Sequence, residues 1–61
     1  MPIIHVEMLE GRTVDQKRQL AQELTDAFVR SCGGDATNVR VLLREVAPVD
    51  WAIGGTLVAD R

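Results

Sequence analysis

The alternation of apolar and polar residues predicts two β-strands that flank a longer central segment. Residues 2–9 are rich in Ile and Val, and Ile4, Val6 and Met8 share one apolar face while the other face is mixed. Residues 39–46 follow the same two-residue period. Each segment therefore has one face that suits burial against another element.

Between these strands the apolar period changes to that of an α-helix, from residue 14 to about residue 32. Thr13 suits the N-cap position, and Gln16 completes a capping box three residues later. Gly33 and Gly34 end the helix, because glycine adopts the left-handed conformation without strain. The apolar stripe of this helix consists of Leu20, Ala21, Leu24, Ala27 and Phe28.

The remainder of the chain predicts a small hairpin. Pro48 ends the second strand, and residues 51–58 place Gly54 and Gly55 between two short apolar runs. A strand–helix–strand unit is right-handed, with parallel strands. We therefore expect an α+β fold over residues 1–61 as a single domain: one β-α-β unit with two parallel strands, one long helix and a C-terminal β-hairpin.

Such a fold leaves one face of its sheet uncovered, with Leu42 and Val46 on it, and this predicts an oligomer. A chain of 61 residues buries only about 60% of its unfolded surface. Cys32 is the only cysteine, so the chain forms no internal disulfide, and one His with one Cys cannot make a four-ligand zinc site. We expect copies of the chain to associate, and we expect neither a metal nor a cofactor.

Charge and hydropathy exclude several classes of protein. A net charge of −2 and an isoelectric point near 5.1 argue against binding to nucleic acid or to anionic membranes. No apolar run approaches the length of a membrane span, and the chain does not start with a basic segment followed by a long apolar run. We therefore expect a soluble, cytoplasmic protein.

Pro2 and two arginines are the first candidates for chemistry. Once Met1 is removed, Pro2 carries a free secondary amine, and burial with nearby cations lowers the pKa of such an amine toward that of a general base. The alternative is a proline that only begins a strand. Arg40 and Arg44 lie on the face predicted to be covered, so they need a bound carboxylate or acidic residues of the chain as partners. The acidic candidates are Glu7, Glu45 and Asp50.

Four other residues admit structural explanations. Arg12 follows a turn glycine, where it is either solvated or a ligand contact. Trp51, the only tryptophan, suits interface packing. His5 suits a structural or interface position on the first strand, and Cys32 suits a small buried or capping position at the end of the helix.

Four features of the sequence stand out together: Pro2, LEGRT at 9–13, VRVLLREV at 39–46 and WAIGG at 51–55. Together they resemble the 4-oxalocrotonate tautomerase family, whose short subunits have a β-α-β fold. The resemblance covers nearly the whole chain. In two positions the chain departs from the family: Trp51 stands where Phe is usual, and Arg44 stands where a small polar residue is usual.

The resemblance implies a cofactor-independent tautomerase that acts on a small unsaturated 2-keto or enol acid such as 2-hydroxymuconate, in the degradation of aromatic compounds. Pro2 would be the catalytic base after removal of Met1. Arg40, from a neighbouring subunit, and Arg12 would bind the carboxylates of a keto-acid or dicarboxylate substrate. The residues implied to line the pocket are Leu9 and Trp51.

The resemblance also implies a hexamer built as a trimer of dimers. Two alternatives stay open. Hydrolytic dehalogenases of haloacrylates share the scaffold and need an acidic residue to activate water. A non-catalytic partner subunit of a hetero-oligomer is the second alternative, because some assemblies of this scaffold combine two related chains.

Overall fold

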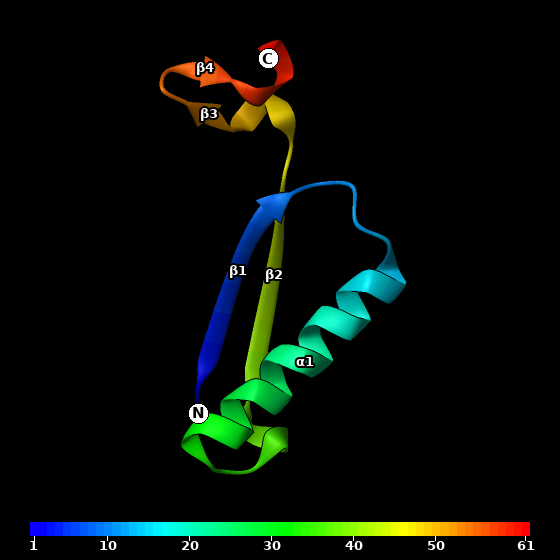
Figure 1. The fold of residues 1–61 in the computed structure, drawn as a ribbon, viewed down its shortest axis with the longest axis vertical. Coiled ribbons are helices and arrows are strands. Elements are labelled where there is room, and N and C mark those ends of the chain that lie inside the picture. The colour runs from blue at the N-terminus through cyan, green and yellow to red at the C-terminus, as the bar shows by residue number, and fades with distance from the viewer.

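The computed structural model describes residues 1–61 and has the predicted order of elements (Figure 1). Both long strands and the helix are confirmed, and each strand begins one residue later than predicted. The helix and strands are β1 (Ile3–Leu9), α1 (Val14–Cys32), β2 (Arg40–Val46), β3 (Ala52–Ile53) and β4 (Thr56–Leu57). Three 3-10 turns complete the chain: η1 (Ala36–Asn38), η2 (Pro48–Asp50) and η3 (Val58–Asp60).

β1 and β2 form the predicted two-stranded parallel sheet, and α1 lies on one side of it. The register pairs Ile3 with Arg40 and Leu9 with Val46, so both strands begin at one end of the sheet and finish at the other. The apolar stripe of α1 is half-buried, as predicted. The apolar side chains of the sheet that share this half-buried face are Ile4, Val6, Met8, Val41 and Leu43.

Both ends of α1 have the predicted caps. The Thr13 hydroxyl accepts a hydrogen bond from the Gln16 N–H (3.1 Å), and the Gln16 side chain accepts one from the Thr13 N–H (2.9 Å). At the other end, Gly33 has a φ of 78°, and its N–H donates to the Val29 carbonyl. Cys32 is exposed, so the buried or capping position predicted for it is wrong: the capping bond comes from the Gly33 backbone.

Glu45 connects the end of β2 to the start of α1. Its carboxylate forms an ion pair with Lys17 and accepts a hydrogen bond from the Gly11 N–H (3.0 Å). The side chains of Lys17 and Glu45 are 30% and 26% exposed. Glu45 is therefore not the partner of Arg40 or Arg44 that the sequence suggested, because alternation along the strand turns it to the opposite face.

The chain is too extended to enclose a core of its own. No residue is fully buried, and the radius of gyration is 14.5 Å, where a compact chain of this length has about 10.5 Å. The hairpin, with η2 and η3, forms an arm beyond the tip of β1 (Figure 1). Gly54 and Gly55 at the tip of the hairpin have φ values of 60° and 87°, as a type I′ turn requires. No helix combines the length and apolar character needed to cross a bilayer.

Candidate active site

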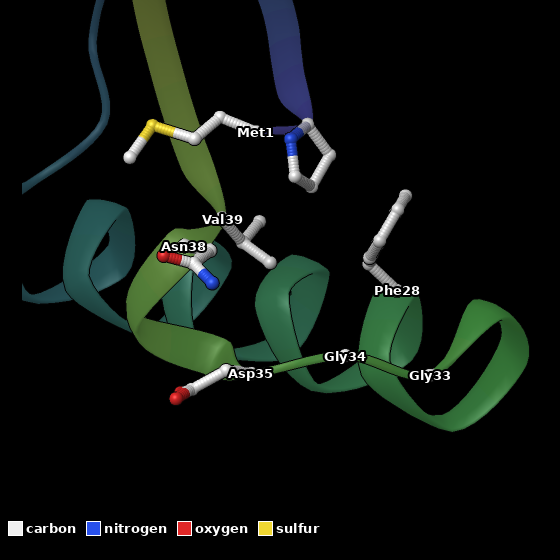
Figure 2. A pocket seen from close by; sticks show the side chains of 8 residues that line it. Met1, Phe28, Gly33, Gly34, Asp35, Asn38 and Val39 are labelled. Carbon is white, nitrogen blue, oxygen red and sulfur yellow. The ribbon is translucent and has the colours of Figure 1, made fainter.

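A pocket of about 240 Å³ lies beside Pro2, at the end of the sheet where both strands begin. Pro2 is half-buried and directly precedes β1. Phe28 from α1 and Val39, which directly precedes β2, contribute apolar side chains (Figure 2). The complete lining is Met1, Pro2, Phe28, Gly33, Gly34, Asp35, Asn38 and Val39.

The backbone of Arg40 pairs with Pro2, whereas its side chain bonds the loop before β2 and does not line the pocket. The Arg40 N–H donates to the Pro2 carbonyl (2.9 Å), and the Arg40 guanidinium donates to the Thr37 carbonyl (2.9 Å). A guanidinium has five N–H donors, so the bond to Thr37 leaves others for an anion. The structure therefore brings two predicted site residues, Pro2 and Arg40, to the same end of the sheet.

Asp35 is an acidic residue on the wall of this pocket. Its Oδ1 accepts hydrogen bonds from the Thr37 N–H and the Thr37 hydroxyl, both at 2.9 Å. These two bonds, the backbone one first, lower the pKa of the Asp35 carboxyl below its ordinary value of 3.8. The carboxylate points away from Met1 and Phe28 (Figure 2), so it caps η1 rather than entering the pocket.

The other predicted site residues lie at the opposite end of the sheet. Leu9 is the last residue of β1, and Arg12 follows in the loop to α1, exposed and without an ion pair. Trp51 is half-buried in the arm, where its carbonyl accepts a hydrogen bond from the Val58 N–H (2.8 Å). The arm follows β2, so it continues from the end at which the strands finish.

One copy of the chain cannot bring all five predicted site residues together. β1 has seven residues and therefore spans about 23 Å, which exceeds the reach of any side chain. Pro2 and Arg40 lie at its start, and Leu9, Arg12 and Trp51 lie at its end or beyond. A single site that uses Pro2 together with Arg12 must therefore draw them from different copies.

The sequence pattern alone misses several residues of the pocket. It assigns Phe28 only to packing on the sheet, and it assigns residues 35–38 only to a connection. The parallel topology contains the missing signal: both strands begin at the same end, so the residues before β2 must lie near the residues before β1. This places Asp35 and Asn38 beside Pro2.

Comparisons with known proteins match the full length of the chain. The family model described as Tautomerase enzyme matches residues 2–61. The 2-hydroxymuconate tautomerase of Pseudomonas putida is 41% identical over 59 residues, which cover 97% of this chain and 94% of that protein. A protein described as a probable tautomerase of Bacillus cereus is 38% identical over 61 residues, 100% of both chains.

Solved structures have the same fold. TomN, a 4-oxalocrotonate tautomerase homologue of the tomaymycin biosynthetic pathway, aligns with a TM-score of 0.95 at 38% identity, over 98% of this chain and 92% of that chain. A heterohexamer 4-oxalocrotonate tautomerase from Chloroflexus aurantiacus aligns with a TM-score of 0.92 at 35% identity, over 98% and 97% of the two chains. With a family match over residues 2–61 and relatives of this identity and fold, the chain is an enzyme of the isomerase class and belongs to the tautomerase family.

Proposed function

We propose that the chain is a cofactor-independent tautomerase that moves a proton within a small unsaturated 2-keto or enol acid such as 2-hydroxymuconate. The observation that carries the proposal is a half-buried Pro2 on a pocket in a member of the tautomerase family. The 2-hydroxymuconate tautomerase of Pseudomonas putida, 41% identical, supports this class of substrate.

Pro2 is the proposed base, and it acts only after Met1 has been removed. While bonded to Met1 the Pro2 nitrogen is an amide without useful basicity, and removal of Met1 leaves a secondary amine. The amine takes the proton of the enol hydroxyl, and the resulting ammonium returns that proton to a carbon as the ketone forms. The half-burial of Pro2 beside Phe28 and Val39 disfavours the ammonium, which keeps the amine available as a base.

Arg40 and Arg12 are the proposed ligands for the two carboxylate ends of the substrate. The planar fork of a guanidinium binds a carboxylate through two hydrogen bonds. Arg40, which would reach the site from a neighbouring subunit as the resemblance implies, would hold the 2-hydroxy end, where negative charge develops. Its bond to the Thr37 carbonyl orients it before substrate arrives. Arg12 would hold the distal carboxylate, and it would enter from another copy, because the length of β1, about 23 Å, lies between it and the Pro2 of its own chain.

Leu9 and Trp51 are the proposed apolar lining, and they would reach the site together with Arg12. All three lie near the end of the sheet at which the strands finish, so one neighbouring copy could supply them. An indole and an isobutyl group against the amine exclude water, and this exclusion also favours the neutral amine. The indole of Trp51 is larger than the phenyl ring of the Phe that is usual at this position in the family, so it would narrow the space left for substrate.

A site of this kind needs an oligomer, and we propose a homohexamer built from three dimers. The Chloroflexus aurantiacus relative is a heterohexamer, so an assembly of this chain with a related one, in which this chain is only a partner, is the alternative. Sedimentation of the purified chain, together with its turnover of substrate, distinguishes the homohexamer from the mixed assembly. An oligomer that forms alone and turns over substrate supports the homohexamer, and a folded 6.7 kDa species at micromolar concentration contradicts it.

Hydrolytic dehalogenation receives less support from the pocket. That reaction needs a carboxylate that can activate water beside Pro2. Asp35 is the acidic residue of the lining, but its Oδ1 is occupied by two bonds from Thr37 and its carboxylate points away from the labelled apolar side chains (Figure 2). We expect no halide release from a haloacrylate, and halide release at the rate of ketonisation would reverse this ranking.

The experiment that tests the proposal is ketonisation of 2-hydroxymuconate, followed by ultraviolet absorbance. The sample is protein whose intact mass confirms the loss of Met1, and the controls are protein that retains Met1 and the variant Pro2→Ala. We expect turnover by the Met-free protein to exceed that of both controls by about 10²-fold. Equal rates in all three samples would remove Pro2 from the mechanism.

A further inference from the structure

A series of hydrogen bonds connects Asp35 to the guanidinium of Arg40. The Asp35 Oδ1 accepts hydrogen bonds from the N–H and the hydroxyl of Thr37, both at 2.9 Å. The Thr37 carbonyl in turn accepts a hydrogen bond from the Arg40 guanidinium, also at 2.9 Å. Asp35 is therefore linked through Thr37 to a proposed ligand of the substrate.

The backbone leaves the Thr37 carbonyl free to accept from this side chain. Thr37 lies in η1, a 3-10 helix of three residues, and in such a helix a carbonyl pairs with the N–H of the residue three positions later. That residue is Arg40, whose N–H donates to the Pro2 carbonyl instead (2.9 Å). The Arg40 guanidinium therefore takes the place of the missing backbone partner, as basic side chains do at the ends of helices.

The carboxylate of Asp35 determines how firmly Thr37 is held. A helix as short as η1 is not stable by itself. Its backbone bonds run from the Asn38 N–H to the Asp35 carbonyl (2.9 Å) and from the Val39 N–H to the Ala36 carbonyl (3.1 Å), so neither of them holds Thr37. The two bonds from the Asp35 carboxylate fix both polar donors of Thr37, and the Thr37 carbonyl is fixed with them.

This arrangement orients Arg40 without neutralising its charge. The two ion pairs of the chain involve other residues, so no carboxylate of the chain is bonded to the Arg40 guanidinium. A carboxylate bonded there directly would compete with a substrate carboxylate for the N–H donors. The Thr37 carbonyl has no net charge, and the guanidinium keeps other donors for an anion.

We propose that Asp35 is a positioning residue for Arg40: it fixes Thr37, and Thr37 holds the guanidinium in the orientation that receives the substrate. This inference rests on the proposed function, in which Arg40 binds the 2-hydroxy end of the substrate. It adds a residue that serves the reaction without contacting the substrate. If Asp35 only capped η1, its effect on turnover would not depend on Arg40.

A double-mutant cycle tests the proposal, with turnover of 2-hydroxymuconate by Met-free protein as the measurement. Asp35→Ala should lower kcat/KM by about fivefold, because an arginine that is not held in place must be immobilised when the substrate binds. In an Arg40→Ala background, Asp35→Ala should have no further effect, because the residue through which Asp35 acts is already gone. The same loss in both backgrounds would mean that Asp35 does not act through Arg40.

Three further variants keep the result interpretable. Asp35→Asn retains a capping oxygen that can accept both bonds from Thr37, so it should restore kcat/KM, and a loss as large as that of Asp35→Ala would contradict a role for these bonds. Thr37→Val removes one of the two bonds, and it should give a smaller loss even if Asp35→Ala folds poorly. Asp26→Ala makes the matched change on α1, where Asp26 is exposed and accepts a bond from Gln22 (3.0 Å), and it should leave kcat/KM unchanged.

A measurement without substrate separates this inference from the proposed function. Nitrogen NMR of the arginine side chains, with the Arg40 signals assigned by their absence from Arg40→Ala, reports how fast the guanidinium rotates. Rotation should be slower in the wild-type chain and in Asp35→Asn than in Asp35→Ala, because the bond to Thr37 restrains it. If this difference is found but no sample turns over 2-hydroxymuconate, the proposed substrate is wrong and the positioning of Arg40 by Asp35 stands. Equal rotation in all three samples would overturn the positioning role.

Discussion

Arg40 has a role in the fold and a proposed role in catalysis. Its N–H makes the first backbone bond between β2 and the segment before β1, and its guanidinium is oriented by the Thr37 carbonyl. We predict that Arg40→Ala lowers kcat/KM for 2-hydroxymuconate by about 10²-fold, because a charged donor at the developing negative charge is lost. Arg18→Ala, a matched change on the surface of α1, should leave kcat/KM unchanged, and an equal loss in both variants would contradict the role of Arg40.

Asp35 allows a test of electrostatics that does not depend on substrate. Its pKa is lowered because the ionised form accepts two bonds from Thr37, so this form is the one that stabilises η1. The contribution is present above the ordinary pKa of 3.8 and is lost as the pH falls through the lowered value. A carboxyl titration by NMR should find a midpoint below 3.8, and Thr37→Val should move it part of the way back. A midpoint at or above the ordinary value in the unmodified chain would contradict this account.

The stability of α1 depends on local signals at both ends of the helix. The capping box of Thr13 and Gln16 satisfies two N–H groups that have no partner within the helix. We predict that Thr13→Ala lowers the free energy of unfolding by about 1 kcal/mol. Thr13→Ser should retain most of the stability that the cap contributes, because serine also has a hydroxyl that can cap the helix. Denaturant unfolding at one fixed protein concentration measures both changes, and equal stability of the two variants would argue against the cap.

The elements were predictable because their signals are local. The capping box, the glycine pair at 33–34 and the two-residue alternation each act within a few residues, and they fix α1, β1 and β2 to within one residue. The pairing of Glu45 with Lys17 was not predictable in this way. It depends on how the loop after β1 approaches the end of β2, which no local pattern encodes.

The candidate site was predictable only in part. Pro2 and Arg40 are marked by residue type and position, and the structure does bring them to one end of the sheet. The positions of Asp35 and Asn38 beside Pro2 follow only from the parallel pairing of the strands. The topology also places Arg12 and Pro2 at opposite ends of β1. A site that uses both residues therefore needs more than one copy of the chain.

Across the whole molecule, no core is buried, so we expect the stability of the fold to depend on association. No residue is fully buried, and apolar side chains are exposed on both the sheet and the arm. Because association stabilises only the folded chain, the melting temperature should rise with protein concentration. A hundredfold dilution should lower the free energy of unfolding by about 3 kcal/mol for each association step. A melting temperature that stays constant over this dilution would contradict an obligate oligomer.

A tautomerase site that takes Pro2 from one copy and Arg12 from another should be rebuilt when two inactive variants are mixed. Met-free Pro2→Ala and Arg12→Ala chains, each with little turnover of 2-hydroxymuconate alone, are unfolded together in equal amounts and refolded. If copies mix at random, about a quarter of the sites regain both residues, so about a quarter of the wild-type turnover is the predicted result. Mass spectrometry must find both chains in the refolded oligomers. If the turnover of these mixed oligomers is no higher than that of the separate variants, the site is not built across copies.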